Sequence, residues 1–198
     1  MWLKEIELES KTVKLIPLKR EHADDLVAAA SDGRLWELWY TSVPNAETVE
    51  AYLAFAFQEQ ERGASLAFTV LDKSTNKVIG STRFCNADVK NQRVEIGHTW
   101  YAKSYQRSAV NTECKQLLLT HAFEVLNAIA VEFRTHWHNQ ASRTAIARLG
   151  AKQDGVLRNH KKMADGVYRD TVVFSIINTE WPVVKMSLSN KLSSGRSR

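Results

Sequence analysis

The spacing of hydrophobic residues divides the first half of the chain into strands and helices. Apolar side chains alternate from Val13 to Pro17, which predicts a strand. They recur at helical spacing over residues 20–30 and again over 49–57, and Asn45 is a suitable N-cap before the second helix. Two apolar runs, LAFTVL and VIGSTRFC, flank the polar turn at residues 72–77 and predict a β-hairpin.

The segment RVEIGHTWY, residues 93–101, is the next predicted strand. Gly97 in its interior indicates a bulge or the close approach of another backbone or a ligand. Period-two alternation assigns the residues of this strand to two faces. One face would carry Val94, Ile96, His98 and Trp100, and the other Glu95, Gly97, Thr99 and Tyr101.

The remainder of the chain continues to alternate between helices and strands. Residues 111–126 are apolar around most of a helix, so this helix is expected to be deeply buried. Residues 129–134 alternate as a strand, and Asn139 can cap a short helix that ends at Gly150. Two closing strands are joined through an Asp-Gly pair, a hairpin sequence. The predicted fold class is α/β (α+β mixed), a mixed sheet with helices on its faces.

Composition narrows the class of protein. The 198 residues are 44% hydrophobic and 25% charged, which is typical of one globular domain. No apolar run approaches the roughly 18 residues of a membrane span, and the charged N-terminal segment lacks the apolar core of a secretory signal. A cytoplasmic location without a membrane partner is therefore expected. Cys85 and Cys114 stand alone, so we expect two buried thiols rather than a disulfide or a metal site.

The positive charge is concentrated near the C-terminus. There are 27 Lys and Arg against 22 Asp and Glu, a net charge of +5. Four of the cations and no acid lie from residue 182 onward, which leaves 27 − 4 = 23 cations against 22 acids elsewhere. We therefore predict a single domain over residues 1–182 and a basic, Ser-rich, disordered tail over 183–198. A nearly neutral body does not favour nucleic acid as a partner, and a monomer or a homodimer is expected.

The loop before the buried helix could bind an anion. A loop that enters a helix presents unpaired N–H groups and the positive end of the helix dipole. The segment from Tyr105 to Asn111 would form this site, although it contains no glycine that would let a phosphate approach the backbone closely. By its pattern alone, the loop is equally consistent with an ordinary helix start.

Five motifs occur in order along the chain: KVIG (77–80), VEIGHTWY (94–101), YQRSAVNTECK (105–115), NQASRTAIARLGA (139–151) and DGVYRDTVVFS followed by EWP. In these motifs the chain resembles the GCN5-related N-acetyltransferase (GNAT) superfamily, and more closely its branch of ribosomal-protein N-terminal acetyltransferase-like proteins. The resemblance extends from about residue 12 to residue 182. It implies the GNAT fold, a mixed, mostly antiparallel sheet of roughly seven strands with helices on both faces and a V-shaped splay between the fourth and fifth strands.

The resemblance implies acetyl-CoA as the co-substrate, bound in the splay without a metal. Its pantetheine would pair with the backbone of one strand, and its pyrophosphate would lie on the following loop. The loop departs from the family pattern Gln/Arg-x-x-Gly-x-Gly/Ala, because Arg107 stands at the first glycine. Arg107 could add a cation for the phosphates or could obstruct their approach. The residues implied for the coenzyme are Trp100, Tyr101, Gln106, Arg107, Ser108, Ala109, Val110, Asn111, Thr112, Asn139 and Arg143.

The resemblance also implies acetyl transfer to a primary amine by direct attack in a ternary complex. Glu95 matches the position of a general base, and Ser142 could protonate the leaving thiolate. Each has a structural alternative, since Glu95 could pair with a cation such as Arg83 and Ser142 could satisfy the first turn of its helix. Asn139 could likewise serve only as a helix cap, and Arg143 could be a solvated cation.

The acceptor is expected to be a protein N-terminal α-amine or a small amine. An α-amine with a pKa near 8 is roughly one-tenth neutral at pH 7, so a weak base would suffice for it. Trp36, Trp39, His98 and His136 are implied as acceptor-binding residues. The two tryptophans could instead be core or interface aromatics.

Two functions other than acetyl transfer are also consistent with the sequence. A CoA-binding module without turnover, acting as a sensor or partner-binding subunit, is favoured by Arg107 in the loop. Nucleic-acid binding through the basic tail would weaken with added salt and would disappear without residues 186–198.

Overall fold

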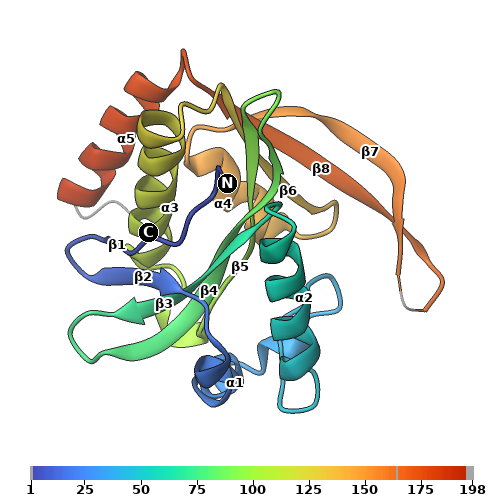
Figure 1. The fold of residues 1–198 in the computed structure, drawn as a ribbon. Coiled ribbons are helices and arrows are strands. Elements are labelled where there is room, and N and C mark those ends of the chain that lie inside the picture. The colour runs from blue at the N-terminus through green and yellow to red at the C-terminus, as the bar shows by residue number, and fades with distance from the viewer. Residues whose placement is uncertain (1, 164, 195–198) are drawn as a thin grey trace.

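One mixed sheet organises the chain (Figure 1). The structure is a computed structural model that describes residues 2–163 and 165–194. In that part of the chain the sheet has eight strands in the order β1-β2-β3-β4-β5-β6-β8-β7. The strands are β1 (Leu8–Glu9), β2 (Val13–Pro17), β3 (Leu66–Asp72), β4 (Lys77–Asp88), β5 (Arg93–Tyr101), β6 (Ala130–His136), β7 (Lys152–Lys162) and β8 (Tyr168–Ile177). The helices are α1 (Ala23–Ser31), α2 (Val49–Glu61), α3 (Val110–Thr120), α4 (Gln140–Arg148) and α5 (Trp181–Ser193).

Helices cover both faces of the sheet, and each face has its own hydrophobic core. Helices α1 and α2 pack on one face, where Leu26 and Leu53 are buried. Helices α3, α4 and α5 pack on the other face, where Leu118, Ile146 and Leu188 are buried. The long β7–β8 hairpin extends beyond these layers as an arm (Figure 1).

The predicted order of strands and helices is confirmed, with two differences. The short strand β1 adds an eighth strand to the roughly seven expected. Residues 183–193 were expected to be a disordered tail, and they form most of α5 instead. Trp181, Val184 and Leu188 recur at helical spacing and are buried, which outweighs the polar composition of the segment. Residues 195–198 of the predicted tail lie outside the described residues.

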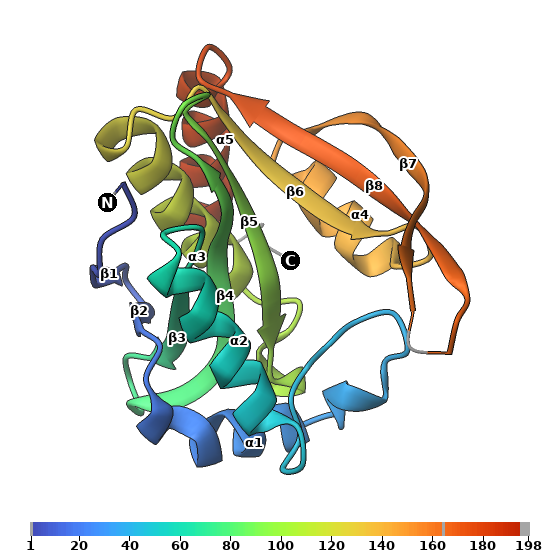
Figure 2. The same cartoon turned by 45° about the vertical axis from the view of Figure 1, so that its right-hand side comes forward.

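The splay between two central strands is confirmed. Strands β5 and β6 pair in parallel from Arg93 opposite Ala130 to Glu95 opposite Glu132. Beyond that point the strands diverge, as Figure 2 shows. Residues 96–101 of β5 therefore have no strand partner on this side among the residues that the structure describes.

A bulge in β5 changes which of its side chains share a face. His98 and Thr99 both lie opposite Thr82 of β4, and His98 takes a left-handed φ of 48°. From the bulge onward the predicted division into faces is wrong. Trp100 is buried on the α1–α2 face together with Glu95, whereas the Thr99 side chain contacts α3 on the opposite face.

Candidate active site

The residues predicted to hold the coenzyme lie where β5 and β6 part. Helix α3 begins at Val110, shortly after β5, and α4 begins at Gln140, shortly after β6. Because β5 and β6 are parallel, both helix N-termini lie at the same end of the splay. The unpaired β5 edge leaves N–H and C=O groups available to an extended ligand.

The loop between β5 and α3 is braced by two carboxylates from the body of the protein. The Ser104 N–H donates to Asp32 Oδ2 at 2.9 Å, and the Tyr105 hydroxyl donates to Asp72 Oδ2 at 2.8 Å. These hydrogen bonds hold the pKa values of Asp32 and Asp72 below their usual range, so both carboxylates stay charged at neutral pH. The loop is therefore held against the ends of α1 and β3.

The start of α3 keeps N–H groups available for an anion. Ala109 is the N-cap residue and offers no side-chain acceptor. The Ser108 hydroxyl accepts the Val110 N–H at 3.3 Å. Asn111 and Thr112 belong to the first turn, whose N–H groups have no acceptor within the helix. This arrangement suits a phosphate group.

Arg107 adopts the left-handed backbone conformation, with φ of 57°. Glycine is the residue that adopts this conformation most readily, which explains the glycine in the family pattern. An arginine there is strained by about 1 kcal/mol. Its side chain is exposed next to the start of α3. The neighbouring Gln106 is fixed, because its Nε2 donates to the Tyr101 carbonyl at 3.0 Å.

Glu113 is a positioning residue that sequence reasoning missed. It lies in the first turn of α3 and is 6% exposed. Its Oε2 accepts the Thr12 N–H at 3.0 Å, its Oε1 accepts the Thr12 hydroxyl at 2.9 Å, and Ser10 is a further donor. The carboxylate thereby ties α3 to the β1–β2 turn. The available signal was an acid in the first turn of a helix that the sequence predicts to be deeply buried.

Glu95 lies at the last position where β5 pairs with β6, and it is 8% exposed. Its Oε2 accepts a hydrogen bond from Asn86 Nδ2 at 2.7 Å and lies 3.5 Å from Arg134 Nε. Burial raises the pKa of this carboxyl, and the Asn86 hydrogen bond and the Arg134 charge partly offset the rise. A carboxylate with a raised pKa is a better proton acceptor near neutral pH. The structural alternative, a pairing of Glu95 with a cation on a neighbouring strand, holds with Arg134 of β6. It does not hold with Arg83, because the guanidinium of Arg83 makes no hydrogen bond to any described residue.

The three site residues predicted at the start of α4, Asn139, Ser142 and Arg143, make different contacts. Asn139 caps the helix, since its Oδ1 accepts the Ser142 N–H at 3.0 Å. The Ser142 hydroxyl makes no hydrogen bond within the described parts of the chain and is free to donate one. Arg143 stacks on Trp137 with 4.3 Å between Cζ and the ring centroid, and its Nη1 donates to the Trp137 carbonyl at 3.3 Å.

The predicted acceptor residues do not form one cluster. Trp39 is 59% exposed, and its ring centroid lies 5.0 Å from that of His136. Trp36 is half-buried and packs on the core beneath α1 and α2, which is the structural alternative considered for it. His98 lies apart from these residues, 6.0 Å from the ring of Phe55, where crowding by protein atoms lowers its pKa to about 4.

Buried ionisable groups lie close beneath the bulge. Lys115 is 4% exposed, and its Nζ donates to Thr82 Oγ1 at 3.3 Å and to Thr99 Oγ1 at 2.5 Å. Burial lowers its pKa to about 8. Cys85 and Cys114 are buried free thiols, as predicted, and burial raises both pKa values. Neither thiol is activated as a nucleophile.

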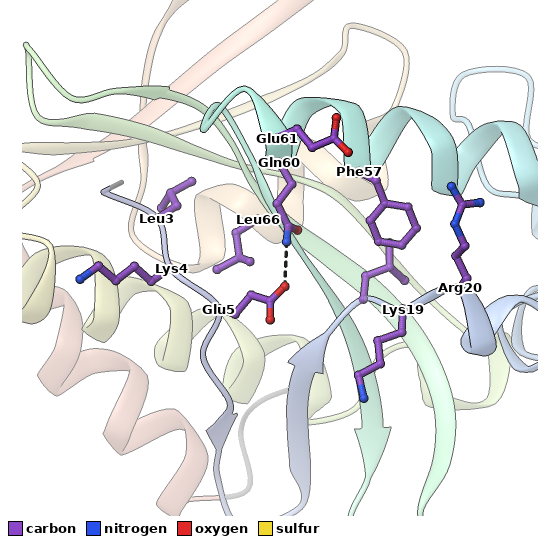
Figure 3. Close-up of a pocket in the computed structure, with 10 residues that line it drawn as sticks. Leu3, Lys4, Glu5, Lys19, Arg20, Phe57, Gln60, Glu61 and Leu66 are labelled. Carbon is purple, nitrogen blue, oxygen red and sulfur yellow. Dashed lines mark hydrogen bonds between the residues drawn. The ribbon is translucent and has the colours of Figure 1, made fainter.

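A hollow of about 730 Å³ lies away from these residues, between the N-terminal segment and the end of α2 (Figure 3). Gln60 Nε2 donates across it to Glu5 Oε1 at 3.0 Å. None of the predicted site residues lines it.

In residues 2–163 and 165–194 we find no group of three or more His, Cys, Asp or Glu suited to a metal ion. No helix in the described structure has the length and apolar character of a membrane span.

Comparison with known proteins identifies the family. Residues 12–152 match the acetyltransferase (GNAT) domain, which is more than half of the chain. The chain belongs to the GNAT acetyltransferase family. This GNAT chain is 29% identical over 119 residues to the uncharacterized N-acetyltransferase p20 of Bacillus licheniformis, covering 60% of this chain and 66% of p20. It is 31% identical over 96 residues to a Bacillus subtilis protein with the provisional name ribosomal N-acetyltransferase YdaF, covering 48% of this chain and 51% of YdaF.

The GNAT chain thus spans between half and two thirds of the length of these two relatives. A crystal structure of a GCN5-related N-acetyltransferase from Brucella melitensis superposes with a TM-score of 0.85 at 29% identity, covering 97% of this chain and 87% of that one.

Proposed function

We propose that this chain is an acetyl-CoA-dependent N-acetyltransferase that acts on a primary amine by direct attack in a ternary complex. One observation carries the proposal. The unpaired edge of β5 joins the buried carboxylate of Glu95 at one end to the N-terminus of α3 at the other. The six residues 96–101 span roughly 20 Å at about 3.3 Å per residue. An extended coenzyme arm fits such an edge.

The chain offers a fitting set of groups for the phosphate end of acetyl-CoA. The first-turn N–H groups of Asn111 and Thr112 carry no acceptor within the helix. Arg107 is exposed beside them and adds a positive charge. The braced loop keeps these groups in place without ligand, which reduces the entropy lost on binding. Acetyl-CoA would supply the activated acetyl thioester.

Glu95 and Ser142 are the proposed proton-transfer groups. The amine nitrogen attacks the thioester carbonyl carbon, a C–N bond forms, and cleavage of the C–S bond releases the CoA thiolate. Glu95, directly or through a water, takes the proton that the amine loses. The Ser142 hydroxyl, free of hydrogen bonds to described residues, donates to the thiolate and regains a proton from solvent. The products are an amide and free CoA.

The acceptor is a protein N-terminal α-amine or a small amine. The name given to YdaF, a ribosomal N-acetyltransferase, supports a protein as the acceptor. The exposed Trp39 beside His136 offers an aromatic surface against which either kind of acceptor could pack. A weak base is sufficient for an α-amine, because a useful fraction is already neutral at pH 7.

Calorimetric titration with acetyl-CoA, using ATP and dephospho-CoA as controls, tests the coenzyme assignment. The proposal expects selective binding of acetyl-CoA, followed by thiol release with a panel of amines. Arg107 favours one second candidate, a CoA-binding module without turnover, because its strained backbone departs from the glycine of the family pattern. Selective binding without acetylation of any amine would favour that second candidate.

A further inference from the structure

Several buried side chains have polar atoms without a hydrogen-bond partner, and half of these atoms belong to Arg83. Within the described residues, six buried side-chain polar atoms lack a hydrogen-bond partner. Five of them are nitrogens of Arg83, His136 and Arg169, and the sixth is the Tyr101 hydroxyl. Buried polar groups in folded proteins are normally hydrogen-bonded, so a group of orphaned donors calls for a partner that is absent from the chain itself.

Arg83 is the most isolated of these residues. It is 1% exposed, and its Nε, Nη1 and Nη2 all lack a partner. Its guanidinium carbon lies 5.2 Å from the Tyr52 ring centroid and 5.6 Å from that of Phe55, both on α2. The rings attract the cation by their faces but accept no strong hydrogen bond from its edge. The donors at the edge of the guanidinium remain available to an oxyanion.

Arg83 lies on the same face of the sheet as Glu95. Arg83 pairs in register with Gly97, which has no side chain, and the next pair on the same face is Cys85 with Glu95. Arg83 and Glu95 are therefore diagonal neighbours across β4 and β5, a relation that places residues about 7–8 Å apart. Phe55, which covers Arg83, is 48% exposed. A ligand would reach Arg83 only if the Phe55 ring moved aside, and the exposure of this ring leaves room for that movement.

No carboxylate in the described chain forms an ion pair with Arg83. Glu95 is engaged by Asn86 and Arg134, at 2.7 Å and 3.5 Å. His98 is neutral at neutral pH, since its pKa is about 4. Lys161 of β7 is exposed and contributes further positive charge near Glu95 and His98. The acceptor side therefore carries an excess of positive charge that an anionic group would balance.

We propose that Arg83 is an anion subsite of the acceptor pocket, and that the acceptor is a primary amine with a carboxylate or phosphate group a few bonds from its nitrogen. The inference rests on the proposed function, and it names the substrate class for the same site. An amine placed at Glu95 would bring an anionic group a few bonds away toward the guanidinium of Arg83, its diagonal neighbour across the strand pair. A bidentate hydrogen bond between Arg83 and the oxyanion would satisfy the orphaned donors.

Matched pairs of amines test the substrate class. The pairs are the C-terminally amidated dipeptides Asp-Ala-amide and Asn-Ala-amide, β-alanine and its amide, and aminoethyl phosphate and ethanolamine, each compared at equal concentration of the unprotonated amine. The anionic member of at least one pair should have a KM roughly tenfold lower or better, the effect of one charge-assisted hydrogen bond. The pair that shows the effect identifies whether a peptide N-terminus, a small carboxylate or a phosphate is preferred.

Variants then assign the effect to Arg83. Arg83→Met should abolish the preference, and Arg83→Lys should retain part of it, while kcat for the neutral amine changes much less than KM for the anionic one. Arg62→Met is the matched control, because Arg62 is an exposed arginine just after α2 that pairs with Glu59. It should leave the preference unchanged. Equal KM values within every pair for the wild type would overturn the proposal while leaving acetyl transfer intact.

A binding experiment tests, independently of catalysis, whether Arg83 binds an anion. Calorimetric titration of the wild type with succinate and with inorganic phosphate should give saturable binding of at least one of them. Arg83→Lys, which keeps the cation if Arg83→Met fails to fold, should bind the same anion roughly tenfold more weakly because it loses the bidentate geometry. Binding without acetylation of any amine would support the anion subsite and reject the proposed function. No binding of either anion, together with unselective acetylation, would assign Arg83 only to the attachment of α2.

Discussion

Arg134 of β6 reaches Glu95 of β5 across the point where the two strands part, with 3.5 Å between Arg134 Nε and Glu95 Oε2. Arg134 also bonds Glu132 Oε2 through Nη2 at 2.9 Å, and Glu132 lies opposite Glu95 in the parallel ladder. The candidate base is therefore held at the apex of the splay by a cation from the facing strand. Its burial raises its pKa, and this cation limits the rise.

Glu95→Gln should lower turnover with little change in the affinity for acetyl-CoA. Loss of a general base reduces kcat on the order of a hundredfold at pH 7. Steady-state kinetics over a range of pH measure the effect, with Glu61→Gln on the exposed end of α2 as a control. Equal kcat for wild type and Glu95→Gln at every pH would remove Glu95 from the mechanism.

The same substitution should stabilise the fold at neutral pH. Because the folded protein raises the pKa of Glu95, this group contributes most to stability below the ordinary Glu pKa of 4.5. That contribution is lost as the pH rises through the raised value. Glu95→Gln, which stays neutral, should therefore have a higher Tm than the wild type at pH 7, and the difference should shrink toward pH 4. A Tm difference that does not vary with pH would contradict the raised pKa.

Arg107→Gly should separate backbone strain from coenzyme binding. Glycine relieves the left-handed strain at φ of 57°, with a gain of up to about 1 kcal/mol in unfolding free energy. The lost cation should weaken acetyl-CoA binding roughly tenfold. Denaturant melts and calorimetry measure the two effects. Tighter binding by Arg107→Gly would show that the arginine obstructs the phosphates instead.

Gly80→Ala should be severely destabilising, because a Cβ at Gly80 would lie 2.2 Å from the Trp100 carbonyl oxygen. The two strands would have to separate next to the coenzyme edge, at a cost of about 2 kcal/mol or more. Gly155→Ala in β7 is the matched control, since a Cβ there meets nothing within 4 Å. Chemical denaturation compares them. Similar unfolding midpoints for both variants would refute the close contact.

Lys115 should impose a pH dependence on stability. Its pKa of about 8 in the fold lies below the ordinary value of 10.5, so the unfolded chain binds more protons between these values. Unfolding free energy should therefore gain up to about 3 kcal/mol from this group as the pH rises from 8 to 10.5. Lys115→Met should lose this gain, and Lys90→Met on an exposed turn should keep it. Parallel pH profiles for wild type and Lys115→Met would contradict the buried, unpaired charge.

Local periodicity predicted most of the fold, because each strand and helix carries its own alternation and turn residues. The pairing of only three residues between β5 and β6 was not visible in these patterns, and the splay followed from the family resemblance. Gly97 indicated a bulge in β5. It did not indicate that the bulge lies at His98, or that it turns the Trp100 side chain to the same face as Glu95. The face of a side chain beyond a bulge depends on the register of the neighbouring strand.

The candidate site was predicted less completely than the fold. The sequence motifs located Glu95 and the loop before α3, and the structure places both at the splay. The isolation of Arg83 could not be predicted, because it depends on how the Tyr52 and Phe55 rings of α2 close over β4. A charged residue within the apolar run VIGSTRFC was the only signal in the sequence.

The most direct test of the account is to follow CoA release and amine acetylation together, with acetyl-CoA and the amine panel, for wild type and Glu95→Gln. We predict that thiol release requires an amine, matches the acetylated product one to one by mass spectrometry, and falls sharply in Glu95→Gln. Thiol release that proceeds equally without an amine, or selective acetyl-CoA binding with no acetylated product, would contradict the assignment as an N-acetyltransferase.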